Sequence, residues 1–148
     1  MKPFLDTGFL VTLVMITRGS RAAWQIIRGF SEPLCVTHLQ SFQVENRLLR
    51  ESTNGENPAL RAAAGDALQR LQRYLDEMVF QTVHVDYDIA IRQAGMWQRD
   101  LGAEAPLALL LLWPALAVTA GATHFLSFDP RPRKFAKSAG LKLLPETL

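Results

Sequence analysis

The sequence contains one cysteine, Cys35, among 148 residues. A lone cysteine excludes an intramolecular disulfide, and its position in the apolar run PLCV predicts a buried, inert thiol rather than a nucleophile. A protein without disulfides is typical of a reducing compartment, so we expect a cytoplasmic location.

The familiar catalytic motifs are also missing. There is no glycine-rich phosphate loop, no serine nucleophile elbow with its Ser-His-Asp order, and no paired Cys/His spacing typical of a metal site. The three histidines stand singly beside or inside predicted strands, which favours structural or surface roles: His38, His84 and His124. Carboxylates are therefore the side chains left to carry chemistry.

The charge is nearly balanced, with a formal net value of +2. Basic residues nevertheless gather in 129–142, where five cations accompany one acid. A solvated amphipathic helix is the simpler interpretation of this segment, and a phosphate-facing patch is the functional one. The candidate RNA contacts in it are Arg131, Arg133 and Lys134.

Two apolar stretches imitate targeting segments. Residues 8–16 follow Asp6 and precede no small-residue cleavage site, so we do not interpret them as a signal peptide. Residues 105–123 carry no charge over 19 positions, which is long enough for a membrane span. Because Pro106 and Pro114 interrupt this run, it predicts a buried helix and no membrane association, with a membrane span as the alternative.

Short apolar runs alternate with helical patterns along the whole chain. This alternation predicts a single α/β domain over 1–148 with a parallel sheet. The clearest helix is 58–79, with Asn57 as its N-cap and Pro58 in its first turn, and a second spans 86–100. The predicted strands are 2–6, 34–38, 82–86, 124–129 and 141–145.

Two of these strands end in an aspartate, Asp6 and Asp129. In open parallel sheets, ligands bind beyond the carboxyl ends of the strands, where the strand order reverses. If the first strand is central and pairs with 124–128, the two carboxylates lie side by side. Carboxylates in such a position are typical ligands of Mg²⁺ or Mn²⁺.

Two motifs, FLDTGFLVTLV (4–14) and GATHFLSFDPRPRKFAKSAGLKLLP (121–145), resemble the PIN-domain family, the ribonuclease fold of VapC-type toxins in toxin–antitoxin pairs. The resemblance covers nearly the whole chain. It implies a three-layer α/β/α domain with strand order 3-2-1-4-5 and four acids that bind one or two divalent ions. It also implies RNA as substrate, an antitoxin-like partner and a homodimer.

Carried over residue by residue, the first and last acids of the family fall on Asp6 and Asp129. Thr7 matches a hydroxyl beside the first acid, while Gly8 replaces the usual serine. The second acid belongs to a Glu-x-x-Asn pattern that ends here at Asn46, and its position holds Gln43.

Glu45 takes the second-acid role only if the register shifts, because two residues rotate a helix by about 200°. Leu110 stands at the third-acid position when the chain is aligned without gaps from Gly121. Asp100 and Glu104 precede that position and are candidates to reach the cleft in its place.

A site with two of its four acids has half the charge needed to offset the dehydration of a hard cation. We therefore expect weak or lost metal-dependent RNA cleavage, with RNA or partner binding retained. The alternative is an active Mg²⁺- or Mn²⁺-dependent endoribonuclease that uses Glu45 or Glu104 as substitute ligands. A structural or oligomeric role unrelated to nucleic acid is the third hypothesis.

Overall fold

A computed structural model describes residues 2–102 and 107–147. Five short strands follow the predicted order along the chain and form one sheet: β1 (Pro3–Leu5), β2 (Leu34–Val36), β3 (Phe80–Thr82), β4 (His124–Leu126) and β5 (Lys142–Leu144). The helices between them are α1 (Thr7–Val14), α2 (Ser20–Ile27), α3 (His38–Asn54), α4 (Pro58–Asp76), α5 (Tyr87–Leu101), α6 (Ala108–Thr119) and α7 (Pro130–Ser138).

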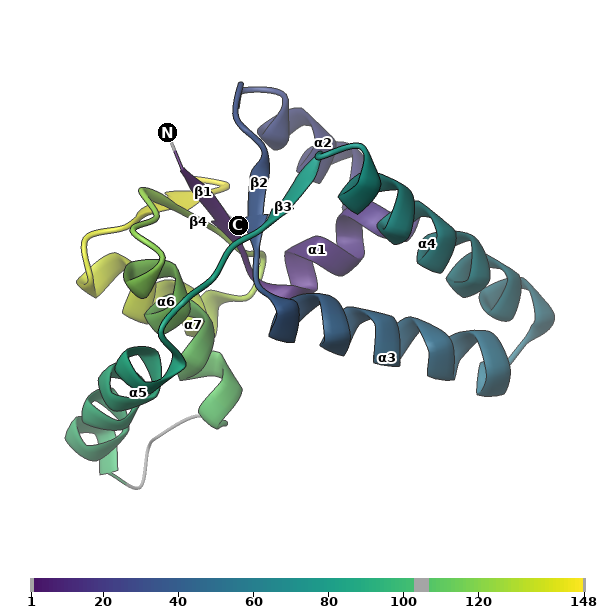
Figure 1. Ribbon diagram of the computed structural model, residues 1–148. Coiled ribbons are helices and arrows are strands. Elements are labelled where there is room, and N and C mark those ends of the chain that lie inside the picture. Colours follow the sequence, from purple (N-terminus) through teal and green to yellow (C-terminus); the bar gives the residue numbers. More distant parts are fainter. Residues whose placement is uncertain (1, 103–106, 148) are drawn as a thin grey trace.

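All strand pairs are parallel, and their order is β3-β2-β1-β4-β5 (Figure 1). This confirms the predicted order. β1 lies at the centre, where Phe4 is opposite Cys35 of β2 and Phe125 of β4. The carboxyl ends of β1 and β4 therefore meet at the same edge of the sheet.

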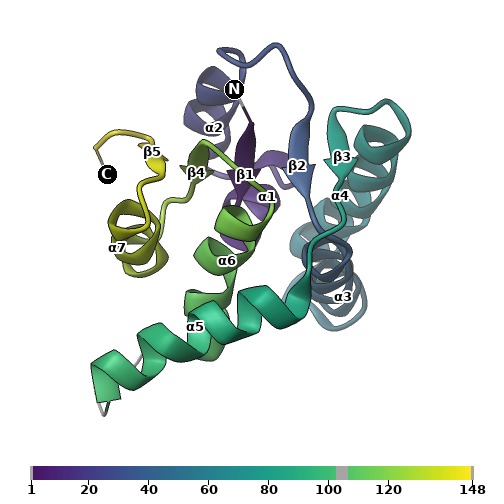
Figure 2. The same ribbon diagram turned by 60° about the vertical axis from the view of Figure 1, so that its left-hand side comes forward.

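The helices cover the two faces of the sheet in separate groups, which completes a three-layer α/β/α fold. Successive residues of β1 point to opposite faces, so Leu5 joins the core under α1–α4 while Phe4 joins the core under α5–α7. The paired helices α3 and α4 project away from the sheet, and α5 extends on the other side (Figures 1 and 2).

The third strand differs from the prediction. β3 is Phe80–Thr82, so it begins two residues before the predicted 82–86, and α4 ends at Asp76 rather than at residue 79. Met78 adopts a left-handed backbone with φ of 58°, which stops the helix and turns the chain into the strand. Non-glycine residues seldom adopt this conformation, so the sequence gives no warning of the turn.

Within the uncharged run Ala108–Thr119 is helical, and half of the residues of this helix are buried. Among residues 2–102 and 107–147, no helix has both the length and the apolar character to cross a membrane. Cys35 is buried in β2 as predicted, and desolvation raises the pKa of its thiol.

Candidate functional site

The two aspartates predicted to share a site do lie together, each at the start of a helix. Asp6 follows β1 directly and caps α1, where its Oδ1 accepts a hydrogen bond of 2.6 Å from Phe9 N. Asp129 follows β4 and caps α7, where its Oδ1 accepts a hydrogen bond of 2.9 Å from Arg131 N. Aspartate is favoured at such positions because it satisfies a free N–H of the first helical turn. We call Asp6 and Asp129 the acid pair.

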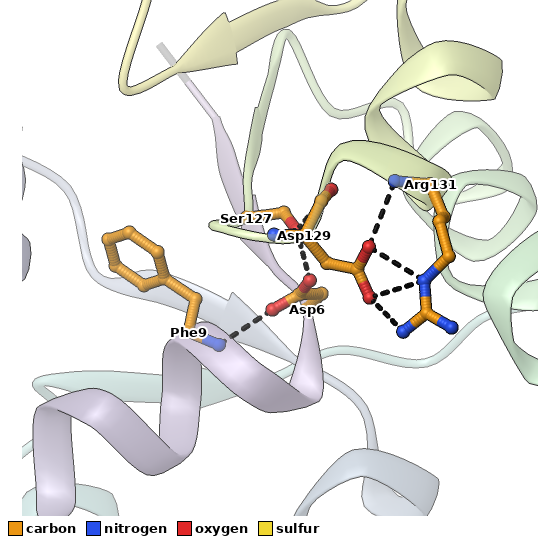
Figure 3. A network of polar contacts seen from close by, with 5 residues as sticks. All are labelled: Asp6, Phe9, Ser127, Asp129 and Arg131. Atoms are coloured by element: carbon orange, nitrogen blue, oxygen red, sulfur yellow. Dashed lines mark hydrogen bonds and ion pairs between the residues drawn. The ribbon is translucent and has the colours of Figure 1, made fainter. Parts of the chain in front are cut away.

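Ser127 joins the two members of the acid pair (Figure 3). Its hydroxyl donates to Asp6 Oδ2, and it accepts a hydrogen bond of 3.0 Å from Asp129 N. The sequence prediction missed this residue. One signal could have identified Ser127: it stands two positions before an aspartate in an otherwise apolar strand end. A buried hydroxyl there needs a hydrogen-bond partner, and the aspartates are the nearest candidates.

The environment of Asp6 disfavours its charge. Only 4% of the residue is exposed, and desolvation raises its pKa to about 6. The hydrogen bonds from Ser127 and Phe9 act in the opposite direction, and the negative charge of Asp129 adds to the rise. Asp6 is therefore a carboxyl group that gains or loses its proton near neutral pH.

The environment of Asp129 stabilises its charge. Arg131 donates hydrogen bonds to both carboxylate oxygens, with Nε 3.0 Å from Oδ1 and Nη2 2.6 Å from Oδ2. This hydrogen-bonded ion pair holds the pKa of Asp129 below its ordinary value. Both carboxylate oxygens of Asp129 thus already accept hydrogen bonds from Arg131.

Arg133 does not belong to a surface patch, which corrects the prediction for this residue. Its guanidinium is buried under the C-terminal segment and donates to Ser127 O at 2.8 Å and to Pro145 O at 2.5 Å. A buried arginine needs such acceptors, so its role here is to tie α7 to the strand ends. Lys134 is exposed, as predicted.

The two candidates for the second acid, Gln43 and Glu45, lie on different sides of α3. Gln43 and Asn46 line a groove with Thr7, the residue next to Asp6. Glu45 is exposed and lines a different groove with Leu49 and Leu68, on the side of α3 that faces α4. Gln43, not Glu45, therefore lies on the side of α3 that shares a groove with Thr7, the neighbour of Asp6.

The candidates for the third acid give no further ligand. Leu110 lies half-buried in the first turn of α6 and has no side-chain oxygen. Asp100 is exposed at the end of α5. Glu104 lies outside the described residues.

The described residues around the acid pair do not form the ligand set of a hard divalent ion. In the part of the chain that the structure describes, no group of three or more His, Cys, Asp or Glu side chains could hold a metal. Both oxygens of Asp6 already accept hydrogen bonds, and Arg131 neutralises Asp129. His38 and His84 do approach each other, with ring centroids 5.7 Å apart, but two imidazoles do not complete a set of oxygen ligands.

The groove beside the acid pair has a volume of about 650 Å³. Thr7 lines its inner end, and the buried Oγ1 of Thr7 has no hydrogen-bond partner within the described residues. The other lining residues all come from α3, and we call this surface the α3 groove: Thr7, Phe42, Gln43, Asn46, Arg47, Arg50, Glu51 and Asn54.

A scan against protein-family models and a search of curated proteins both find no match for this chain. The structure supplies the α/β/α fold and the strand order, while membership in the PIN-domain family stays a prediction from the two motifs.

Proposed function

We propose that this protein is a PIN-like relative of the VapC-type ribonucleases that binds RNA and has weak or lost metal-dependent cleavage. The observation that carries the proposal is the state of the acid pair. Asp6 and Asp129 occupy the strand ends expected for a nuclease, but the carboxylate oxygens of both residues already accept hydrogen bonds from donors of the protein, among them Arg131.

The chemical reason is the demand of phosphodiester hydrolysis. A divalent ion in such a site polarises the phosphate and lowers the pKa of the attacking water. Losing one preorganised group of this kind often lowers the rate by about 10² to 10³. Gln43 offers a neutral carbonyl and Leu110 offers no ligand, so two of the expected four contributions are reduced or absent.

Retained RNA binding has separate support. The α3 groove opens beside the acid pair and carries Arg47 and Arg50. Within the described residues, neither guanidinium has an ion-pair or hydrogen-bond partner, so both are available to phosphate groups. Binding RNA in the cell agrees with the cytoplasmic location expected from the lone buried Cys35.

The active endoribonuclease remains the alternative, with Mg²⁺ or Mn²⁺ as cofactor. Glu45 is a poor substitute ligand because it lines the groove on the α4 side of α3. Glu104 is the remaining candidate for this role. Loss of metal-dependent cleavage in Glu104→Gln, with RNA binding unchanged, would establish the alternative.

A contact with another protein chain also belongs to the proposal. Ile91 and Met96 of α5 are each more than half exposed, and exposed apolar side chains of this kind favour protein–protein contact. An antitoxin-like partner or a homodimer follows from the resemblance. Light scattering on the wild type and on Ile91→Glu/Met96→Glu would detect a homodimer that uses this helix.

The test of the proposed function measures binding and cleavage separately. Labelled single-stranded RNA is titrated with protein in a chelator, and cleavage is then followed in Mn²⁺ for the wild type and Asp6→Asn. We expect saturable binding without chelator-sensitive cleavage. Cleavage that requires Mn²⁺ and disappears in Asp6→Asn would overturn the inactive form of the proposal, whereas cleavage that survives in Asp6→Asn points to a contaminating nuclease.

A further inference from the structure

The α3 groove carries amide and guanidinium side chains along one stripe of the helix. Gln43, Arg47, Arg50 and Asn54 recur at steps of four, three and four residues, so they lie along the same face. From Gln43 to Asn54 this stripe is about 16 Å long at the rise of an α-helix. Thr7 lines the same groove as this stripe, and α3 runs outward from the sheet (Figure 1).

The charges on this stripe favour a polyanion. Arg47 and Arg50 are exposed, and Glu51 is the one acid among the residues that line the groove. Other arginines near α3 and α7 are occupied by the protein itself: Arg61 by Gly55 O, Arg70 by Val14 O, Arg131 by Asp129 and Arg133 by Ser127 O.

An aromatic ring stands at the rim of the same groove. Phe42 is 64% exposed although it is large and apolar. The amides of Gln43, Asn46 and Asn54 lie along the stripe beside it and can both donate and accept hydrogen bonds. An exposed ring next to guanidinium and amide groups is the arrangement that binds unstacked bases.

We propose that the α3 groove is the binding track for single-stranded RNA, in which Arg47 and Arg50 contact phosphates and Phe42 stacks on a base. This inference rests on the proposed function and moves the RNA surface from the basic segment of α7 to α3. Duplex RNA fits the stripe less well, because its bases are stacked within the helix and offer no free face to Phe42.

The test uses fluorescence anisotropy with a labelled single-stranded RNA of about eight nucleotides and the matching duplex, in a chelator. Arg47→Glu/Arg50→Glu should weaken binding of the single strand at least tenfold. It should also reduce the slope of log affinity against log salt by about 1.4, which corresponds to two lost phosphate contacts. The matched control is Arg21→Glu/Arg28→Glu, which makes the same charge change on two exposed arginines, one in α2 and one at its C-cap.

Phe42→Ala separates stacking from charge. It should weaken binding of the single strand about tenfold, leave the salt slope unchanged and have little effect on the duplex. Because the replaced side chains are exposed, all these variants should fold, which urea denaturation checks.

The outcomes distinguish the two levels of the proposal. If the wild type binds RNA but both α3 variants bind like the control, the groove assignment is wrong and the proposed function stands. Equal effects of Phe42→Ala on single strand and duplex would also reject the stacking role. If the wild type binds neither form of RNA, the proposed function and the groove assignment both fall.

Discussion

Asp6 and Asp129 share a sequence context and a task in the fold, yet the structure gives them opposite electrostatic environments. Each follows a strand of the central sheet and caps the next helix. Asp6 is buried and its pKa is raised, whereas Asp129 is paired with an exposed arginine and its pKa is lowered. Burial and a neighbouring cation, rather than the residue type, decide the charge of a strand-end carboxylate.

The largest expected effect is on the pH dependence of stability. The pKa of Asp6 is about 6 in the folded protein and 3.8 without burial, so its stabilising protonated form is complete below about pH 4 and is lost as the pH rises through 6. Between about pH 4 and pH 8 the wild type should lose about 2 to 3 kcal/mol relative to Asp6→Asn, whose side chain does not titrate. Urea denaturation at both pH values measures the difference.

The control for this prediction is Asp129→Asn. The lowered pKa of Asp129 gives stability that is present above its unfolded value and lost as the pH falls through its folded value, below about pH 4. The difference between the wild type and Asp129→Asn should therefore change much less between about pH 4 and pH 8 than that between the wild type and Asp6→Asn, because burial, the largest cause of the raised pKa of Asp6, stays in place. Parallel curves for the wild type and Asp6→Asn would contradict the raised pKa.

Replacement of each aspartate by alanine should lower the free energy of unfolding by different amounts. Near pH 4, Asp6→Ala should lower the free energy of unfolding by about 2 kcal/mol, because the buried donors Ser127 Oγ and Phe9 N both lose their acceptor. Asp129→Ala removes a more exposed cap and should cost about 1 kcal/mol or less. Equal losses in urea denaturation would show that burial does not distinguish the two sites.

Ser127→Ala tests the bridge between the two carboxylates. It removes the donor to Asp6 and the acceptor of Asp129 N, so we expect a loss of about 1 to 2 kcal/mol in the free energy of unfolding. The pKa of Asp6 should rise further, because the Ser127 hydrogen bond lowers it. Ser138→Ala removes an exposed hydroxyl that donates to Phe135 O in α7 and serves as the matched control.

The smallest expected effect follows from Arg131→Ala. Without the guanidinium, the pKa of Asp129 should move up towards its ordinary value, while the pKa of Asp6 stays raised by burial. Carboxyl carbon NMR titration of the two aspartates measures both shifts. An unchanged pKa of Asp129 would mean that the ion pair does not form in solution.

The fold and the convergence of Asp6 and Asp129 follow from patterns that the sequence displays. Apolar runs mark the strands, and parallel strands bring their carboxyl ends to one edge. The burial of Arg133 does not follow, because arginine is usually solvated and its carbonyl acceptors come from distant segments. The start of β3 was missed for a local reason, the left-handed backbone of Met78.

For α3, the spacing of residues in the sequence predicts which side chains share a face of the helix, but not which other element that face contacts. The rotation between Gln43 and Glu45 predicted that the two side chains lie on different sides of the helix, and in the structure Gln43 lines the groove that contains Thr7 while Glu45 lines the groove towards α4. The α3 groove itself required the placement of Thr7 against α3, a contact between separate elements that no local pattern encodes.

We infer that the acid pair does not bind a divalent ion, because donors of the protein, among them Arg131, already engage its carboxylate oxygens. Calorimetric titration of Mn²⁺ into the wild type, with Asp129→Asn as the comparison, tests it most directly. We expect no saturable binding at millimolar Mn²⁺ and the same weak heats for both proteins. Saturable one-to-one binding that disappears in Asp129→Asn would contradict it.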